Sequence, residues 1–169
     1  MTAAFDQPRR ASLLANSYTR IEVVIRAFGS MSRLDWFALL GSEWTICDKL
    51  WRARAVLKGI LRDASRAELD AMMEQAERDT LAPLPSRITV YRGCYKMNRS
   101  GLSWSLNRAV AERFPSLLRY RHEGDQPLLL TGTVSRDRVV LKIDRDEQEV
   151  IAAQVKVVST EPVTLAALD

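Results

Sequence analysis

Histidine and cysteine are scarce in this chain of 169 residues, which contains one of the former and two of the latter. A single histidine argues against most zinc sites and excludes a two-histidine mechanism. His122 lies in the polar stretch Arg-His-Glu-Gly-Asp, which predicts a solvated loop residue and not the base of a Ser/His/Asp triad. Cys47 and Cys94 stand far apart and outside metal-ligand spacing, so we expect two buried thiols and no disulfide.

Long apolar runs and glycine-rich nucleotide motifs are also missing. No run approaches the roughly 18 apolar residues of a membrane span. The N-terminus, Met-Thr-Ala-Ala-Phe-Asp, has no basic stretch followed by the apolar core of a secretory signal. We therefore expect a cytoplasmic protein without a membrane partner, with delivery into another cell by a signal-independent route as the alternative. The dinucleotide fingerprint and the P-loop are absent, so a bound nucleotide must be held in another way.

The chain has the composition of an ordinary globular protein, 47% hydrophobic and 27% charged. Its length predicts a single domain over 1–169, with a helical part, 1–85, and a β-rich part, 86–169. Residues 86–121 hold eight Lys and Arg against one Glu, a net charge of +7, whereas 122–169 hold five against nine Asp and Glu, a net charge of −4. A cleft with an anion-binding wall opposite a wall of carboxylates explains these counts, and a patchy solvated surface explains them equally well.

The first half of the sequence has the three- and four-residue periodicity of amphipathic helices. We expect helices over 18–28 and 33–62, the latter with an optional break near Gly41. A third helix follows from Ser65 to about 79, since Ser65 and Glu68 match a capping box. The positions expected to be buried are Ile21, Val24, Ile25, Phe28, Trp36, Phe37, Leu40, Trp44, Cys47, Leu50, Trp51, Leu69, Met72, Met73 and Ala76.

The pattern changes at Pro85, where alternation with a period of two begins. We expect strands over 87–92, 102–105, 128–135, 139–143 and 150–158. A short helix is expected over 107–114. Helices first and strands afterwards predict an α+β fold, with N-terminal helices packed on a mainly antiparallel β core.

Arg92 ends the first of these strands on the same face as Ile88 and Val90. An arginine at the rim of an apolar face is well placed to meet an anion, and Gly93 after it allows close approach to the backbone. An edge arginine that leaves the sheet for solvent, followed by a turn glycine, is the alternative that this motif taken alone favours.

Two further motifs carry hydroxyls and carboxylates. Ser103 and Ser105 point to one side of a strand and Trp104 to the other, so the two hydroxyls can orient a sugar or a carboxylate. Glu147 and Glu149 share one side of an extended segment, and paired carboxylates suit chemistry in which positive charge develops on a sugar. The alternatives are a serine strand that faces water and caps the next helix, and an acidic turn before a strand.

Taken together and in this order, the three motifs resemble those of the mono-ADP-ribosyltransferases, and more narrowly of the Arg–Ser–Glu branch that includes the clostridial-type toxins. The resemblance covers about 86–158, and the helical first half stands where that family places its helices before the first core strand. It implies a β core of ADP-ribosyltransferase type. It also implies an enzyme that cleaves NAD as its substrate, releases nicotinamide and transfers ADP-ribose to a macromolecular acceptor without a metal.

The resemblance implies a role for each motif residue. Arg92 holds the phosphate and ribose of NAD, a charge-assisted contact suited to a guanidinium, and the backbone of Gly93 meets the nicotinamide amide. Ser103 helps to orient the catalytic Glu149, which hydrogen-bonds the ribose and stabilises the oxocarbenium-like centre. Glu147 assists the acceptor, and a glutamate at that place accompanies arginine acceptors in the family.

More loosely, Phe114 stands where similar enzymes stack an aromatic ring on nicotinamide, although a core phenylalanine explains it equally well. The segment 115–126 resembles the mobile loop that covers NAD in the family. From it Arg119 or Arg121 can reach the diphosphate and Tyr120 can line the pocket.

Two departures from the family accompany these matches. Trp104 replaces the usual threonine between Ser103 and Ser105, and Ser105 is still expected to contact NAD. The separation of Arg92 and Glu149 is short for a toxin of this type, which indicates a reduced version of the domain.

Three alternatives stay open at this point. The first is an NAD glycohydrolase with the same site and water as acceptor, against which Glu147 mildly favours a macromolecule. Among macromolecules we expect a protein, with a nucleic-acid acceptor as the other option. The second alternative is a non-enzymatic module whose basic stretch 86–121 binds nucleic acid or an acidic protein, against which the small net charge of +4 argues. The third is a degenerate transferase fold that serves as an interaction surface or inhibitor.

Overall fold

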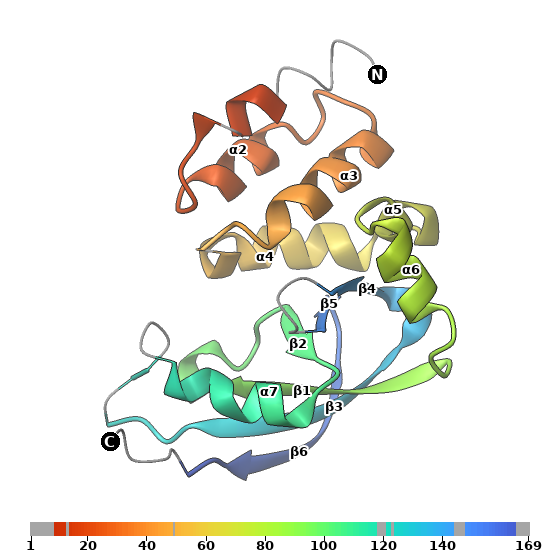
Figure 1. Ribbon diagram of the computed structural model, residues 1–169. Coiled ribbons are helices and arrows are strands. Elements are labelled where there is room, and N and C mark those ends of the chain that lie inside the picture. The colour runs from red at the N-terminus through yellow and green to blue at the C-terminus, as the bar shows by residue number, and fades with distance from the viewer. Residues whose placement is uncertain are drawn as a thin grey trace. The chain divides into compact units, whose positions relative to one another are not determined.

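A computed structural model describes residues 9–12, 14–48, 50–117, 121–122, 124–143 and 148–164. The chain divides into two compact units, Met1–Thr80 and Leu81–Asp169, the first helical and the second built on a sheet (Figure 1). The division falls close to Pro85, where the sequence pattern changes. Mixed helix and antiparallel sheet is the α+β class that the pattern predicts.

The helical unit packs around buried tryptophan and aliphatic side chains. Its helices are α2 (Arg20–Arg26), α3 (Arg33–Trp44), α4 (Leu50–Arg62), α5 (Arg66–Ala71) and α6 (Gln75–Leu81), and the division between the units falls before Leu81, the last residue of α6. The Trp36 indole is fully buried and donates to the Val24 carbonyl at 2.7 Å, which links α3 to α2. Within the described parts of the chain, no helix has both the length and the apolar character needed to cross a membrane.

The helix predicted over 33–62 is two helices, because α3 ends at Trp44 and α4 begins at Leu50. Gly41 does not break α3. A Cβ on Gly41 would lie 2.1 Å from the Met72 carbonyl oxygen, so the missing side chain lets the backbone after α5 approach α3 closely. Two of the residues predicted to be buried on these helices, Phe28 and Trp51, are exposed.

The helix predicted from Ser65 to about 79 is likewise divided, into α5 and α6. The Glu77 carboxylate accepts a hydrogen bond at 2.8 Å from the Glu74 backbone N–H, a group that a continuous helix would bond to a carbonyl. Leu69, Met72 and Met73 are buried as predicted, whereas Ala76 is exposed.

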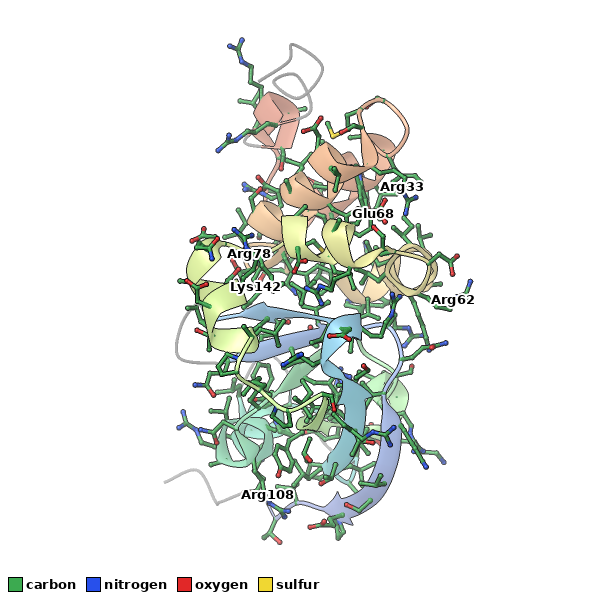
Figure 2. The ribbon with its side chains drawn as sticks, turned by 90° about the vertical axis from the view of Figure 1, so that its right-hand side faces the viewer. Arg33, Arg62, Glu68, Arg78, Arg108 and Lys142 are labelled. Carbon is green, nitrogen blue, oxygen red and sulfur yellow. The ribbon has the colours of Figure 1, made fainter. Side chains whose placement is uncertain are left out.

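The predicted capping box at the start of α5 is confirmed, and it joins an ion pair with α3. The Glu68 carboxylate accepts from the Ser65 backbone N–H at 2.7 Å, and Arg33 Nε donates to it at 2.5 Å. Figure 2 shows Arg33 and Glu68 side by side. These donors, that of Arg33 foremost, lower the pKa of Glu68 to about 2.

Replacement of Glu68 by glutamine should lower the free energy of unfolding by about 1–3 kcal/mol at pH 7, because charge-assisted bonds and part of a cap are lost. Since the pKa of Glu68 is lower in the folded chain, its contribution is complete above the ordinary value of 4.5 and disappears as the pH falls toward about 2. Denaturant unfolding between pH 7 and pH 2 measures both effects. The exposed Glu22→Gln is the control, expected to change stability by less than about 0.5 kcal/mol. A Glu68→Gln deficit that stays constant down to pH 2 would contradict the assignment.

The second unit is one antiparallel sheet of six strands in the order β4-β5-β2-β1-β3-β6. The strands are β1 (Arg87–Cys94), β2 (Ser103–Ser105), β3 (Leu128–Ser135), β4 (Val139–Lys142), β5 (Glu149–Ala152) and β6 (Lys156–Pro162). The single strand predicted over 150–158 is therefore two strands, β5 and β6. They lie on different sides of β1, because β5 pairs with β2 and β4 whereas β6 pairs with β3.

Both faces of this sheet carry buried side chains. One face, the core face, carries the buried Val90, Trp104, Leu130, Leu141 and Val150, which alternation places on one side. The opposite face is called the serine face here, since it carries Ser103 and Ser105, and it also carries the buried Leu129, Val140 and Ile151. The helix α7 (Arg108–Arg113) packs against β1 and β2 and lies in front of β1 and β3 in Figure 1.

Both cysteines are free and buried, as the sequence predicts. Burial raises the pKa of the Cys47 thiol to about 12 and also raises that of Cys94, so neither thiol is activated as a nucleophile. His122 is exposed, and its ring lies edge-on to that of the buried Tyr95 at a centroid distance of 5.1 Å.

Candidate functional site

The strands that carry the three predicted motifs are neighbours in the sheet. In the order β5-β2-β1, the serine strand lies between the strand that begins at Glu149 and the strand that contains Arg92. Segments some fifty residues apart in the sequence thus come together through backbone pairing. The sheet is the scaffold of the candidate site.

A row of polar side chains crosses the serine face at this place. Ser105 is paired with Tyr91 on one side and with Glu149 on the other, and Glu149 is paired in turn with Lys142. Residues directly opposite in an antiparallel pair share a face, with Cβ atoms roughly 4.5–5.5 Å apart. Ser105 and Lys142 are buried, whereas Glu149 and Tyr91 are half-buried. In this row the carboxylate of Glu149 stands between the hydroxyl-bearing Ser105 and the ammonium-bearing Lys142.

The two serines differ in their relation to Glu149. Ser103 is paired with Ile151, whereas Ser105 stands directly opposite Glu149. Ser105 also accepts a hydrogen bond from the Asn107 backbone N–H at 2.9 Å, and Asn107 caps α7 as the capping alternative predicts. The orienting role expected of Ser103 stays a prediction, and the register gives Ser105 the nearer place.

Arg92 lies on the core face, because it is adjacent in β1 to Tyr91 of the serine face. Its guanidinium donates to the backbone carbonyl of Ser103 and, at 3.0 Å, to that of Asn98. A Cβ on Gly101 would lie 2.1 Å from Arg92 Nη2, so the guanidinium packs directly on that glycine. Arg92 therefore holds the segment that leads into the serine strand, and its contact with NAD stays a prediction.

Replacement of Arg92 by alanine should lower the free energy of unfolding by about 1–3 kcal/mol, because the carbonyls of Ser103 and Asn98 lose a charged donor. The same change should weaken NAD binding. Denaturant unfolding and an NAD titration measure the two effects separately. Unchanged NAD affinity would remove Arg92 from the ligand contacts, and unchanged stability would contradict its hold on the serine strand.

Gly93 is on the serine face, and the space beside it is occupied. A Cβ there would lie 1.8 Å from the Ala111 carbonyl oxygen and 2.7 Å from Pro115 Cδ. The Tyr95 hydroxyl donates to the Pro115 carbonyl at 2.9 Å and anchors the same segment. The close approach that Gly93 permits is thus made by the end of α7, and its contact with nicotinamide stays a prediction. Phe114, half-buried, belongs to this segment.

Several predicted residues lie outside the described part of the chain. These are Glu147, Arg119 and Tyr120. The division of labour between Glu147 and Glu149 and the contacts of the loop with NAD therefore stay predictions. Conversely, the sequence did not indicate that Tyr91 and Lys142 belong to the polar row. The alternation of β1 indicated only that Tyr91 faces away from Arg92, and nothing local connected Lys142 with Glu149.

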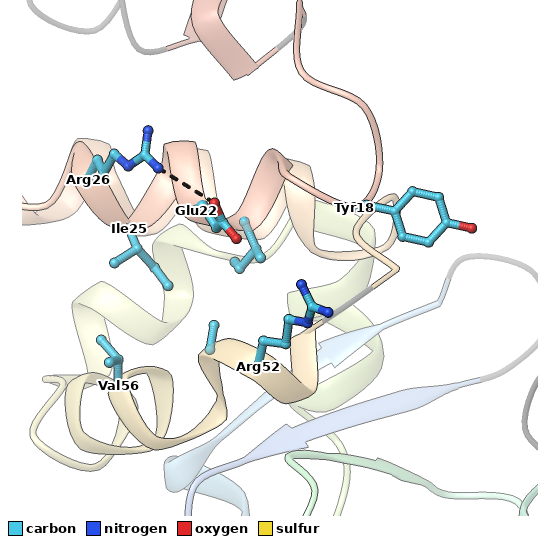
Figure 3. A pocket seen from close by; sticks show the side chains of 8 residues that line it. Tyr18, Glu22, Ile25, Arg26, Arg52 and Val56 are labelled. Atoms are coloured by element: carbon cyan, nitrogen blue, oxygen red, sulfur yellow. Dashed lines mark ion pairs between the residues drawn. The ribbon is translucent and has the colours of Figure 1, made fainter.

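The helical unit has a hollow between α2 and α4, lined mainly by apolar side chains (Figure 3). Glu22 and Arg26 form an ion pair of 3.5 Å at its edge. No nucleophile or carboxylate pair lies there, so the hollow offers no chemistry comparable to that of the serine face. Among the described residues, no group of three or more His, Cys, Asp and Glu side chains could hold a metal ion.

No family model, no curated protein and no solved structure matches this chain.

Proposed function

We propose that the chain is a mono-ADP-ribosyltransferase that binds NAD over the serine face, cleaves the nicotinamide–ribose bond and transfers ADP-ribose to a protein acceptor. The observation that carries the proposal is the pairing of Ser105 with both Tyr91 and Glu149 across three adjacent strands. This pairing makes neighbours of the three strands that carry the motifs and puts Ser105 beside Glu149 on one face, whereas the Arg92 side chain lies on the other.

The reaction exchanges one bond at C1′ of the nicotinamide ribose for another. The bond to the ring nitrogen breaks, its electron pair leaves with neutral nicotinamide, and positive charge develops on the ribose. The acceptor nucleophile then bonds to C1′ and loses its proton. A fixed carboxylate beside the developing charge stabilises the transition state more strongly than the ground state, and it is worth several kcal/mol in a site that excludes water.

The position of Glu149 suits this role. It is the first residue of β5, so its backbone is held by pairing with β2 and β4 while its side chain stays half-exposed to a ligand. Lys142, paired directly opposite in β4, adds a positive charge to the same row. Ser105 offers a hydroxyl from the other side. Glu147 is proposed to take up the proton of the acceptor, and the backbone of Gly93 to meet the nicotinamide amide. The Arg92 side chain lies on the opposite face, so its proposed contribution is to hold the segment that leads into the serine strand.

The acceptor is tested by incubation of the chain with NAD labelled in its ADP-ribose part, in the presence of a cell lysate. Transfer predicts a labelled protein band that is sensitive to protease and not to nuclease. A nuclease-sensitive product would place the label on nucleic acid, and free ADP-ribose without a labelled macromolecule would make the chain an NAD glycohydrolase. Intact NAD would contradict both and favour a binding module.

A further inference from the structure

We infer that Tyr91 is a substrate-positioning residue, whose ring and hydroxyl contact the nicotinamide riboside part of NAD beside Glu149. The inference rests on the proposed function and adds a contact to it. Tyr91 belongs to none of the three sequence motifs. It stands in the polar row because of strand pairing alone.

The two residues paired with Tyr91 on the serine face are small and polar. It is paired with Ser105 on β2 and with Thr131 on β3, so it has a short hydroxyl side chain on each side. α7 packs on this face against Gly93, the next residue of β1 on the same side as Tyr91, and an aromatic or sugar ring is proposed to lie against the accessible part of the Tyr91 ring. The ring of Tyr91 is half-buried and is therefore partly accessible to a ligand.

The Tyr91 hydroxyl is proposed to bind the ligand. It makes no hydrogen bond to any residue within the described ranges, although a tyrosine hydroxyl is both donor and acceptor. The hydroxyl is not among the buried polar atoms of the described residues that lack a partner, so water can reach it. A ribose hydroxyl or the nicotinamide amide can replace that water as its hydrogen-bond partner.

The distances across the sheet agree with one ligand touching both groups. Adjacent strands lie about 4.8 Å apart, so Tyr91 and Glu149 stand roughly 10 Å apart with Ser105 between them. A ribose hydrogen-bonded to Glu149 can therefore extend its attached ring over Ser105 toward Tyr91. Beyond Tyr91, the end of α7 closes the face at Gly93.

Two substitutions separate the contributions of the ring and the hydroxyl. Tyr91→Phe removes only the hydroxyl and should raise the Kd for NAD about 3- to 10-fold, as loss of one neutral hydrogen bond does. Tyr91→Leu also removes the ring and should raise the Kd by more than about tenfold. The matched control is Tyr18→Leu, at an exposed tyrosine of the helical unit, which should leave the Kd unchanged.

The Kd is measured by titration with NAD, together with nicotinamide release and the free energy of unfolding of each variant. Raised Kd values with unfolding of Tyr91→Phe unchanged support the inference. If the unsubstituted chain binds and cleaves NAD and Tyr91→Phe and Tyr91→Leu bind it equally well, the inference is wrong and the proposed function stands. If the unsubstituted chain neither binds nor cleaves NAD, the proposed function fails first and the inference with it. Should Tyr91→Leu not fold, Tyr91→Phe decides.

Discussion

Nicotinamide release should fall by at least about 10²- to 10³-fold when Glu149 is replaced by glutamine, while the affinity for NAD changes little. Glutamine keeps the shape and the hydrogen-bonding capacity of the side chain and removes its negative charge. The charge matters most when positive charge develops on the ribose, so its loss affects the transition state more than the bound substrate. The measurement is nicotinamide release under saturating NAD, combined with a separate NAD titration.

The matched control for Glu149→Gln is Glu161→Gln. Glu161 is a carboxylate of β6, on the other side of β1, and it forms an ion pair of 2.9 Å with Arg108 at the surface. This control should retain full activity. A Glu149→Gln chain that kept most of its activity, or that lost NAD binding and activity in equal proportion, would contradict the assigned role.

Replacement of Gly93 by alanine should lower the free energy of unfolding by about 1–3 kcal/mol or more, through overpacking against a fixed backbone. The atom that a Cβ would meet at 1.8 Å is the Ala111 carbonyl oxygen, which belongs to α7 and cannot rotate away as a flexible side chain can. The end of α7 must therefore shift from β1. Since this end closes the serine face beside Tyr91, NAD binding should weaken together with stability.

Denaturant unfolding of Gly93→Ala beside Gly59→Ala provides the comparison. Gly59 is inside α4, and a Cβ there would meet no atom within 4 Å. Alanine at that position should stabilise the chain by about 0.5–1 kcal/mol, because it restricts the unfolded backbone and favours the helix. Equal stability of Gly93→Ala and the unsubstituted chain would mean that α7 is not held against β1 as described.

The parts of the fold that depend on local signals could be predicted from the sequence. Ser65 and Glu68 specify a helix start by their own hydrogen bonds, and the alternation of Ile88 and Val90 specifies a half-buried strand. The interruptions were harder to predict. The chain between Val150 and Val158 is mostly apolar and lacks glycine and proline, and pairing with different partners divides it into β5 and β6.

The same distinction holds for the candidate site. Within one strand, alternation correctly placed Ser103 and Ser105 opposite the buried Trp104. Across strands, the register decides which residue faces Glu149, and register is set by distant pairing and by the turns between strands. The sequence therefore indicated a serine partner for Glu149 and did not indicate that Ser105 stands directly opposite. For the same reason it did not reveal that Arg92 reaches the serine strand through backbone carbonyls.

The most direct test of the central claim, that the serine face cleaves NAD, is the appearance of nicotinamide when the purified chain is incubated with NAD, with and without a protein acceptor mixture. We predict release that saturates with NAD and is lost in Glu149→Gln. NAD that stays intact under both conditions, with the chain folded as shown by cooperative unfolding, would contradict the claim.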